Sequence, residues 1–294
     1  MTMDRVDLHT HSTHSDGSLL PGQLLALAKE KGLRAIALTD HDTVAGVEEA
    51  VTAGKELGVE VVPGVEISAQ FGPGTMHILG YYLQTTQPEL IGALKKLQQA
   101  RAARNPKIIE RLQTLGLKIT AAEVLELSGG QVGRPHIAQA LVQRGYVSSM
   151  DEAFSRYLKK GAVAYVEKFR FSPQHAIGLI RKAGGLASLA HPFTLGIDEP
   201  AELRPVVMEL QAMGLEGMEV FYPEHTEQMT ALYDDVAQRL GLLRTGGSDF
   251  HGDLKTGSDL GGGKQAHNLD YALLQALKER LKGSETSHIQ GRVR

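Results

Sequence analysis

The chain contains no cysteine and no tryptophan among its 294 residues, and each absence excludes a class of site. Without cysteine there are no disulfides, no cysteine zinc fingers, no iron–sulfur clusters and no thiol nucleophile. This composition fits a reducing compartment, so we expect a cytoplasmic protein. Aromatic residues make up only 5% of the chain, which argues against a base-stacking sheet of the RNA-recognition type.

Long apolar runs and a strong net charge are also missing. No run approaches the ~20 residues that a membrane-spanning helix needs, and the first seven residues carry no apolar segment of a secretory signal. We therefore expect no membrane partner. The net charge of −3 argues against a reader of duplex DNA. The length allows one large domain or a barrel with an insertion, and the oligomeric state is left open.

Short apolar runs alternate with helical patterns in two parts of the chain. The first part predicts strands at 5–8, 34–38, 59–62 and 76–83, with helices at 21–31 and 44–57. The second part predicts strands at 186–190, 217–221 and 243–245, with helices at 173–183, 200–213, 225–240 and 271–281. Such alternation predicts a parallel sheet or barrel of the α/β class.

Residues 99–165 break this alternation, because nearly all of them have a helical pattern. Thr120 with Glu123, and Ser149 with Glu152, have the spacing of capping boxes. This segment carries ten Lys and Arg against five Asp and Glu, a net +5, which leaves −8 for the rest of a chain whose total is −3. We predict a barrel built from 1–98 and 166–294, with 99–165 as a small helical domain that caps its mouth and binds substrate.

Histidines and carboxylates form short clusters that follow the predicted strands. The clusters are Asp7-Leu8-His9-Thr10-His11, Ser15-Asp16-Gly17, Thr39-Asp40-His41-Asp42, Glu66 after a Pro-Gly turn, His77, His191-Pro192 and Ser248-Asp249-Phe250-His251. Barrels of alternating strands and helices place their chemistry at the carboxyl ends of the strands. Imidazole with carboxylate and no thiolate suits manganese, iron or zinc. Two such ions can clamp the attacking and leaving oxygens at phosphorus. The pattern therefore predicts a multi-metal hydrolytic site.

These motifs, together with Pro63-Gly64-Val65-Glu66-Ile67-Ser68 and His77-Ile78-Leu79-Gly80, resemble those of the PHP (polymerase and histidinol phosphatase) family of metal-dependent phosphoesterases. The resemblance covers nearly the whole chain, in order. It implies a distorted (β/α)7 barrel. The most similar branch has a helical insertion and includes phosphatases of 3′,5′-bisphosphonucleotides and exoribonucleases that trim RNA from the 5′ end.

The resemblance also implies the ligands of two or three divalent ions, with Mn²⁺ expected first and Fe²⁺ or Zn²⁺ as alternatives. By that resemblance, His9, His11, Glu66 and Asp249 hold the first ion; Asp16, His41 and His251 hold the second; and Glu66, His77 and His191 hold the third. Asp16, His41, His251 and Asp40 are the catalytic candidates. Asp40 has a second interpretation, as a residue that only holds its turn or orients a ligand.

Three further residues are candidates for substrate contacts. Gly133-Arg134-Pro135-His136 resembles the phosphate-binding element of the branch, and Arg134 precedes a predicted helix N-terminus, which favours an anion. His136 follows in the same element. His225 comes after a predicted strand, so it either contacts substrate or begins the next helix.

The function expected from these residues is metal-dependent hydrolysis of nucleotide phosphomonoesters. Trimming of short RNA from the 5′ end is expected as a second activity that uses the same chemistry. Metal-activated hydroxide would attack phosphorus. Two alternatives stay open. One is a phosphatase of another small metabolite such as histidinol phosphate, and the other is a metal-binding accessory domain with little activity of its own.

Overall fold

The structure is a computed structural model that describes residues 4–72, 74–128, 130–197, 199–255, 258–263 and 268–291. His267, which the sequence predicts in a loop, lies outside the described residues. No helix in the described ranges combines the length and the apolar character needed to cross a bilayer.

Seven strands form one sheet whose spatial order is the order of the chain. They are β1 (Arg5–Thr10), β2 (Leu33–Leu38), β3 (Glu60–Ala69), β4 (Met76–Tyr81), β5 (Leu186–Leu189), β6 (Gly217–Phe221) and β7 (Leu243–Gly246). The segment after β7 returns to β1, where the His11 N–H donates to the Phe250 carbonyl at 3.0 Å. The expected α/β class and distorted (β/α)7 barrel are confirmed.

The distortion comes from β4, which is antiparallel to both of its neighbours, whereas the other neighbouring pairs are parallel. The alternation in the sequence predicted a parallel sheet or barrel and did not single out β4. Only residues 70–75 separate β3 from β4, and so short a connection can join antiparallel strands but cannot hold a crossover helix. The start of β4 therefore lies at the edge where the parallel strands end.

The predicted turn at Pro63-Gly64 is wrong, because both residues lie inside β3. A Cβ on Gly64 would stand 2.8 Å from a methyl of Thr39 and 3.0 Å from the Gly80 carbonyl. Glycine is thus required here by the close approach of β2 and β4, and not by a turn. As a result, β3 is ten residues long and carries Glu66 on a rigid strand.

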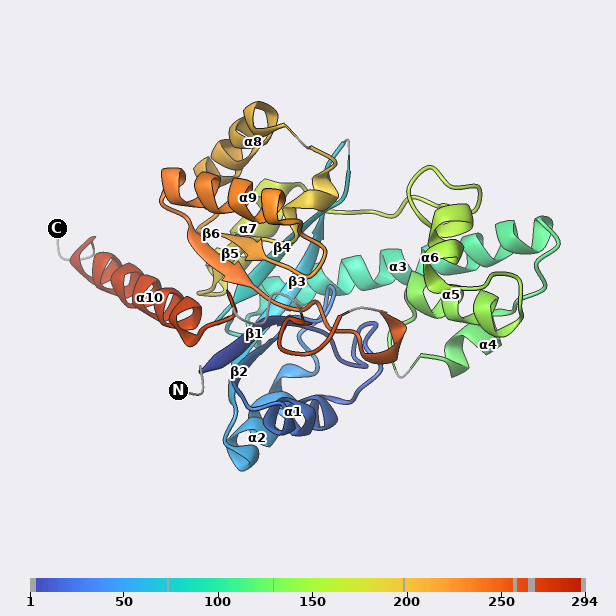
Figure 1. The fold of residues 1–294 in the computed structure, drawn as a ribbon, viewed down its shortest axis with the longest axis horizontal. Coiled ribbons are helices and arrows are strands. Elements are labelled where there is room, and N and C mark those ends of the chain that lie inside the picture. Colours follow the sequence, from blue (N-terminus) through green and yellow to red (C-terminus); the bar gives the residue numbers. More distant parts are fainter. Residues whose placement is uncertain are drawn as a thin grey trace.

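Ten α-helices are described, and most of them pack around the outside of the barrel (Figure 1). They are α1 (Pro21–Glu30), α2 (Val47–Leu57), α3 (Pro88–Thr114), α4 (Ala121–Glu126), α5 (Arg134–Gln143), α6 (Met150–Ala153), α7 (Pro173–Lys182), α8 (Pro200–Ala212), α9 (Glu227–Leu240) and α10 (Tyr271–Gly291). A π-helical turn spans Phe154–Leu158, and 3-10 turns span Pro192–Leu195 and Gly252–Leu254. Helices α1 and α2 pack over one side of the sheet, and α7 to α9 pack over the other. Helix α10 continues ten residues beyond its predicted end at 281.

Helices α4 to α6 and the far half of α3 project to one side of the barrel (Figure 1). They share a core of their own, which includes Ile108, Leu112, Ile137 and Leu141. Helix α3 runs unbroken from the barrel core, where Leu94 and its neighbours lie, into this second core. The boundaries 1–98, 99–165 and 166–294 stay a prediction, although no break in the chain marks the first of them. The capping box between Thr120 and Glu123 is confirmed.

Candidate metal centre

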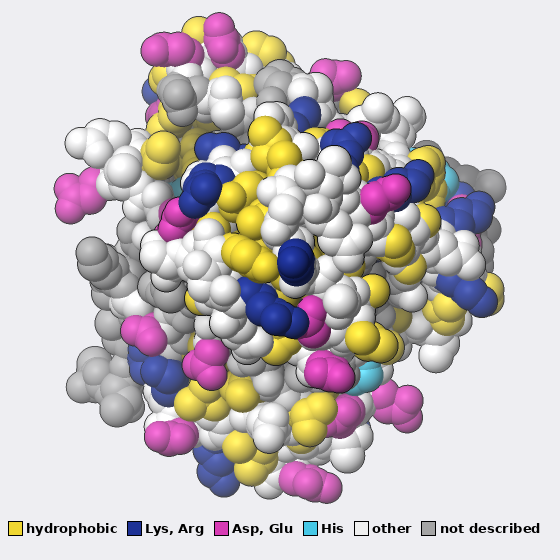
Figure 2. Space-filling view, turned by 90° about the vertical axis from the view of Figure 1, so that its right-hand side faces the viewer, with side chains coloured by type: hydrophobic (Ala, Val, Ile, Leu, Met, Phe, Trp, Pro, Cys, Tyr) yellow, Lys and Arg dark blue, Asp and Glu magenta, His cyan; other side chains and the backbone are white. Residues whose placement is uncertain are grey.

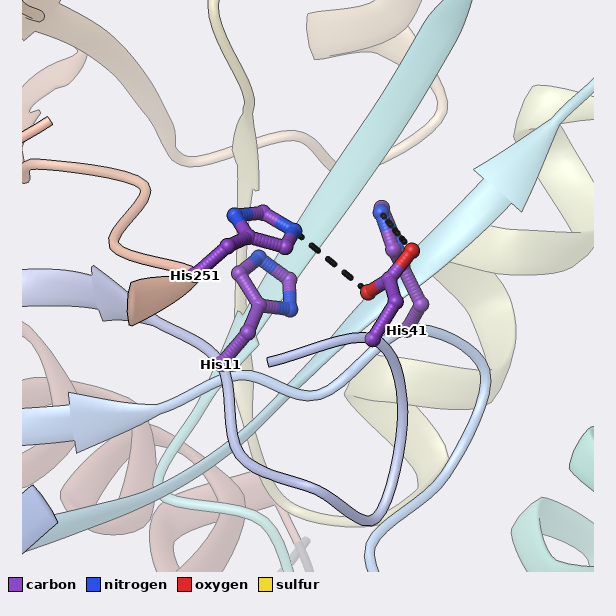
Figure 3. Close-up of side chains that lie close together, drawn as sticks. His11, His41 and His251 are labelled. Carbon is purple, nitrogen blue, oxygen red and sulfur yellow. Dashed lines mark ion pairs between the residues drawn. The ribbon is translucent and has the colours of Figure 1, made fainter. Parts of the chain in front are cut away.

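Nine histidines and carboxylates converge at the edge of the barrel where the parallel strands end. They come from β1 and the loop after it (His9, His11, Asp16), from the end of β2 (His41), from β3 and β4 (Glu66, His77), and from the segments after β5 and β7 (His191, Asp249, His251). His77 joins them because β4 runs antiparallel, so its first residues lie at this edge. Figure 3 shows the rings of His11, His41 and His251 turned toward one another.

Three overlapping groups within this set have donor atoms within 4.8 Å of one another. They are His9, His11, Glu66 and Asp249; His11, Asp16, His41 and His251; and His41, Glu66 and His77. The first group is the predicted first set. The second adds His11 to the predicted second set. The third contains His41 and not the predicted His191. His191 lies close by, with its Nε2 2.9 Å from Glu66 Oε1.

Glu66 lies at the centre of these groups, fully buried on β3. Its Oε2 is 2.7 Å from His41 Nδ1 and 3.4 Å from both His9 Nε2 and His11 Nε2, and its Oε1 is 2.7 Å from His77 Nδ1. Burial alone would favour the neutral acid, but the surrounding imidazoles outweigh it and hold the pKa of Glu66 well below its usual range. The carboxylate is therefore ionised and is positioned to bridge two cations.

The donor atoms of this cluster fit bound metal. Among the described residues, six of them are buried and have no hydrogen-bond partner: His9 Nε2, His11 Nε2, Asp16 Oδ1, His41 Nδ1, Glu66 Oε2 and His77 Nδ1. Buried polar atoms are nearly always satisfied, and a divalent cation would satisfy a convergent set of this kind. Burial lowers the pKa of His11 to about 3 and that of His77 to about 4, which leaves both rings neutral with a lone pair to donate.

Glu219 on β6 orients two residues of the cluster, and no sequence motif indicated it. It is fully buried, accepts the His9 Nδ1–H at 3.1 Å, and accepts the His191 backbone N–H at 2.7 Å. Fixing Nδ1 as the protonated nitrogen turns Nε2 of His9 toward the cluster. A glutamate inside the apolar run Gly217–Phe221 was the available signal.

Lys255 and Tyr222 orient Asp249 in a similar way, and neither was expected at the site. The Lys255 ammonium and the Tyr222 hydroxyl donate to Asp249 Oδ2 at 2.7 and 2.8 Å. Oδ1 is left facing His11 Nε2, at 3.0 Å. Asp249 and His191 both adopt positive φ, +50° and +24°, a conformation that proteins tolerate mainly at functional sites.

The remaining clustered carboxylates hold structure rather than face the donors. Both oxygens of Asp40 accept hydrogen bonds from Ser12 and Ser15, which fixes the loop that carries Asp16. This geometry favours the holding interpretation of Asp40 over the catalytic one. Asp7 accepts hydrogen bonds from the backbone and side chain of Ser248 and so ties β1 to the segment after β7.

A small cavity of about 190 Å³ opens beside the metal donors, and we call it the basic cavity. Its lining combines four of the clustered donors (Asp16, His41, His77 and His251) with five cations (Arg101, Arg104, Arg134, Lys168 and Arg170). Of these cations the sequence analysis named only Arg134. No sequence motif indicated the other four. Arg101 and Arg104 are two cations on a long helix, and Lys168 and Arg170 lie in an irregular segment.

Arg104, like Arg134 in the same cavity, has no acidic partner among the described residues. It is 4% exposed, and among the described residues its guanidinium donates only to the side-chain oxygen of the adjacent Asn105. Burial, with the nearby charges of Arg134 and Arg101, lowers the pKa of Arg104 to about 8. By contrast, Arg101 pairs with Asp42 at 2.9 Å, as does Lys168. The cavity therefore has an excess of positive charge that a bound anion would neutralise.

A second pocket, of about 630 Å³, lies on the other side of the donors, and we call it the aromatic pocket. Its walls include Phe154, Phe193 and Tyr222, and it reaches His191, Asp249 and His251. Its volume is typical of pockets that hold small organic ligands.

The two other predicted substrate residues lie outside these cavities. His136 Nδ1 accepts the Gly133 N–H at 2.9 Å, so this ring caps the start of α5. His225 Nδ1 donates to the Val220 carbonyl, and its ring packs among Phe193, Tyr222 and Tyr233. The geometry of both favours a structural role.

Comparison with known proteins agrees with the geometry of the site. The family model described as PHP domain matches residues 7–168. The chain belongs to the PHP family. Three relatives match this chain over most of the length of both proteins. A 5′-3′ exoribonuclease of Haemophilus influenzae is 36% identical over 84% of this chain and 90% of its own length. A 3′,5′-nucleoside bisphosphate phosphatase of Chromobacterium violaceum is 32% identical over 88% of this chain and 91% of its own.

The third relative, a phosphoribosyl 1,2-cyclic phosphate 1,2-diphosphodiesterase of Eggerthella lenta, is 36% identical over 84% of this chain and 94% of its own length. Among solved structures, one described as an amidohydrolase from Chromobacterium violaceum with bound sulfate and no metal superposes with a TM-score of 0.82. It is 32% identical and covers 87% of this chain and 90% of its own. As a PHP protein with this donor set, the chain is a metal-dependent hydrolase of phosphoric esters.

Proposed function

We propose that this PHP enzyme removes a phosphate from nucleoside 3′,5′-bisphosphates and, by the same chemistry, trims short RNA from its 5′ end. The observation that carries the proposal is the buried, unpaired Arg104 in a basic cavity that opens directly onto the metal donors. A nucleotide with two phosphate groups can place one on the donors and the other against this cavity.

We further propose that the nine clustered residues are the metal ligands, in the sets that the resemblance to the family implies, and that the ions are Mn²⁺. His9, His11, Glu66 and Asp249 would hold one ion, Asp16, His41 and His251 a second, and Glu66, His77 and His191 a third. When bound, such ions lower the pKa of water and neutralise charge that develops on phosphate oxygens. The mixed imidazole and carboxylate set suits Mn²⁺, Fe²⁺ or Zn²⁺.

The protein's own side chains supply binding and orientation. Arg104 and Arg134 would donate charge-assisted hydrogen bonds to a phosphate group in the basic cavity. Asp42 holds Arg101 and Lys168 in place through its Oδ2, at 2.9 Å from each. Burial of these groups keeps the local dielectric low, which strengthens their attraction for the anion.

The aromatic pocket supports a nucleoside as the rest of the substrate. Phe154 lines both cavities, so the two meet beside His251. A purine or pyrimidine ring can stack on such walls, and stacking is tolerant of base identity. Histidinol, a single small ring on a short chain, would leave much of a 630 Å³ pocket unfilled. This observation favours the nucleotide over the metabolite alternative.

The test is phosphate release with Mn²⁺ from adenosine 3′,5′-bisphosphate, compared with AMP, histidinol phosphate and phosphoribosyl 1,2-cyclic phosphate. A 5′-phosphorylated short RNA is assayed in parallel by product length. We expect the highest kcat/KM for the bisphosphate, with Asp249→Ala inactive as the control for contamination. Preference for histidinol phosphate or for the cyclic phosphate would replace the proposed substrate. No turnover of any of them by metal-loaded protein would favour the accessory-domain alternative.

A further inference from the structure

A third hollow, of about 420 Å³, lies beside the basic cavity, and we call it the outer groove. Thr75, Lys168 and Arg170 line both hollows. The outer groove shares no lining residue with the aromatic pocket, so a mononucleotide that fills the aromatic pocket and the basic cavity would leave it free for a longer substrate.

The outer groove combines exposed aromatic surface with positive charge. Phe169 is 53% exposed, and Phe71 and Tyr165 line the same hollow. Lys160, Lys168 and Arg170 also line it, against the single acidic residue Glu167. Figure 2, which looks at the side of the molecule where α3 to α6 project, shows Lys and Arg side chains interspersed with hydrophobic ones. Aromatic rings alternating with cations are the usual means of holding single-stranded nucleic acid.

Phe169 is exposed but held in place. Its ring meets that of Phe171 edge to face, with centroids 5.0 Å apart. Phe171 in turn is fixed to the end of β3, because its carbonyl accepts the Gln70 N–H at 2.7 Å. On the other side, Lys160 donates to the Gly72 carbonyl at 2.6 Å. A preorganised ring loses little freedom when a base stacks on it, which favours binding.

We propose that the outer groove is a subsite for the next nucleotide of a single-stranded nucleic acid chain, with Phe169 stacking on its base and Lys160 and Arg170 facing its backbone. The inference rests on the proposed function, because it takes the metal donors as the place where the phosphate ester is broken. It adds the residues, apart from the metal donors, that would hold the chain beyond the reacting nucleotide.

The test compares Phe169→Ala with Val163→Ala, an equally exposed apolar residue of the same segment that does not line the groove. The kcat/KM is measured on a 5′-phosphorylated pentaribonucleotide and on adenosine 3′,5′-bisphosphate. We expect Phe169→Ala to lower the value for the pentanucleotide about tenfold, the effect of losing one stacked base, and to leave the bisphosphate unchanged. Phe169→Tyr should retain activity on both, and so should Val163→Ala.

Binding provides a readout that does not depend on turnover. The fluorescence anisotropy of a labelled pentanucleotide, measured with chelator present to prevent cleavage, should give a higher Kd for Phe169→Ala than for Val163→Ala. Equal Kd values and equal pentanucleotide kinetics for the two variants would overturn the subsite. A parent enzyme that cleaves the bisphosphate but neither binds nor cleaves the pentanucleotide would also overturn it, while the proposed function would stand. Failure on the bisphosphate alone, with the oligonucleotide effect intact, would count against the proposed mononucleotide substrate only.

Discussion

Removing the unpaired cation Arg104 should make the protein more stable and the enzyme worse. Arg104→Met keeps the length of the buried stem but removes a guanidinium that is 4% exposed, donates only to Asn105 among the described residues, and is repelled by Arg134 and Arg101. Replacing a buried ion pair by apolar groups of similar volume can stabilise a protein by about 1–4 kcal/mol, and an unpaired cation has no partner that offsets the cost of its burial. Because each kcal/mol shifts the Tm of a chain of this size by about 2–4 °C, a rise of several degrees is expected.

The activity should change in the opposite direction. A hydrogen bond to a charged group is worth about 1.5–3 kcal/mol, so kcat/KM for the bisphosphate should fall about ten- to hundredfold. Thermal unfolding is followed with Mn²⁺ present and phosphate absent, and phosphate release is measured on the same preparations. Added inorganic phosphate should raise the Tm of the parent more than that of the variant, since only the parent retains the full anion site.

Arg101→Met is the matched control. It removes the same charge from the same helix, but Arg101 is paired with Asp42 at 2.9 Å, so its loss leaves a buried carboxylate with one cation fewer. This variant should be less stable than the parent. If Arg104→Met proved as destabilising as Arg101→Met, the argument that Arg104 awaits an anion would be refuted.

Three other outcomes follow from the contacts at the donors. Glu219→Gln should weaken Mn²⁺ binding about 10–100-fold, because the amide no longer fixes the protonated nitrogen of His9. Titration calorimetry would measure the affinity, and an unchanged value would contradict the role assigned to Glu219. Lys255→Met should lower both metal affinity and kcat, since Asp249 Oδ2 loses its cation, whereas Lys278→Met, which removes a surface pair with Glu60, should change neither. Chelation should lower the Tm, and Mn²⁺ should restore it in proportion to the logarithm of its concentration; a Tm indifferent to both would argue against a metal that binds the folded state.

The alternation of apolar runs and helical patterns was sufficient to predict the α/β class, because each strand and helix shows its own period in the chain, while the resemblance to the family supplied the distorted (β/α)7 barrel. The clusters around His9, His41 and Asp249 predicted the donor set for a related reason: each cluster follows a strand, and carboxyl ends of parallel strands meet. The nine donor residues could thus be named from the order of motifs along the chain. Their roles as ligands remain proposals, although the geometry brings all nine together.

Local order could not show the direction of β4 or the length of β3. Pro63-Gly64 has the composition of a turn, and only the approach of Thr39 and the Gly80 carbonyl shows why glycine is needed inside a strand. Likewise His136 and His225 look available in the sequence, but one caps a helix and the other packs among aromatic rings.

The sequence by itself determined the fold class, the family and the residues to propose as metal ligands, since these depend on residue type and on the order of motifs along the chain. Only the tertiary structure decided which side chains support them. Glu219, Lys255, the pair Arg101 and Arg104, and the pair Lys168 and Arg170 come from separate parts of the chain, and no motif joins them. Their function depends on which charges are left unpaired once the chain has folded. The distances between helices and strands set this pairing, and the sequence does not show those distances.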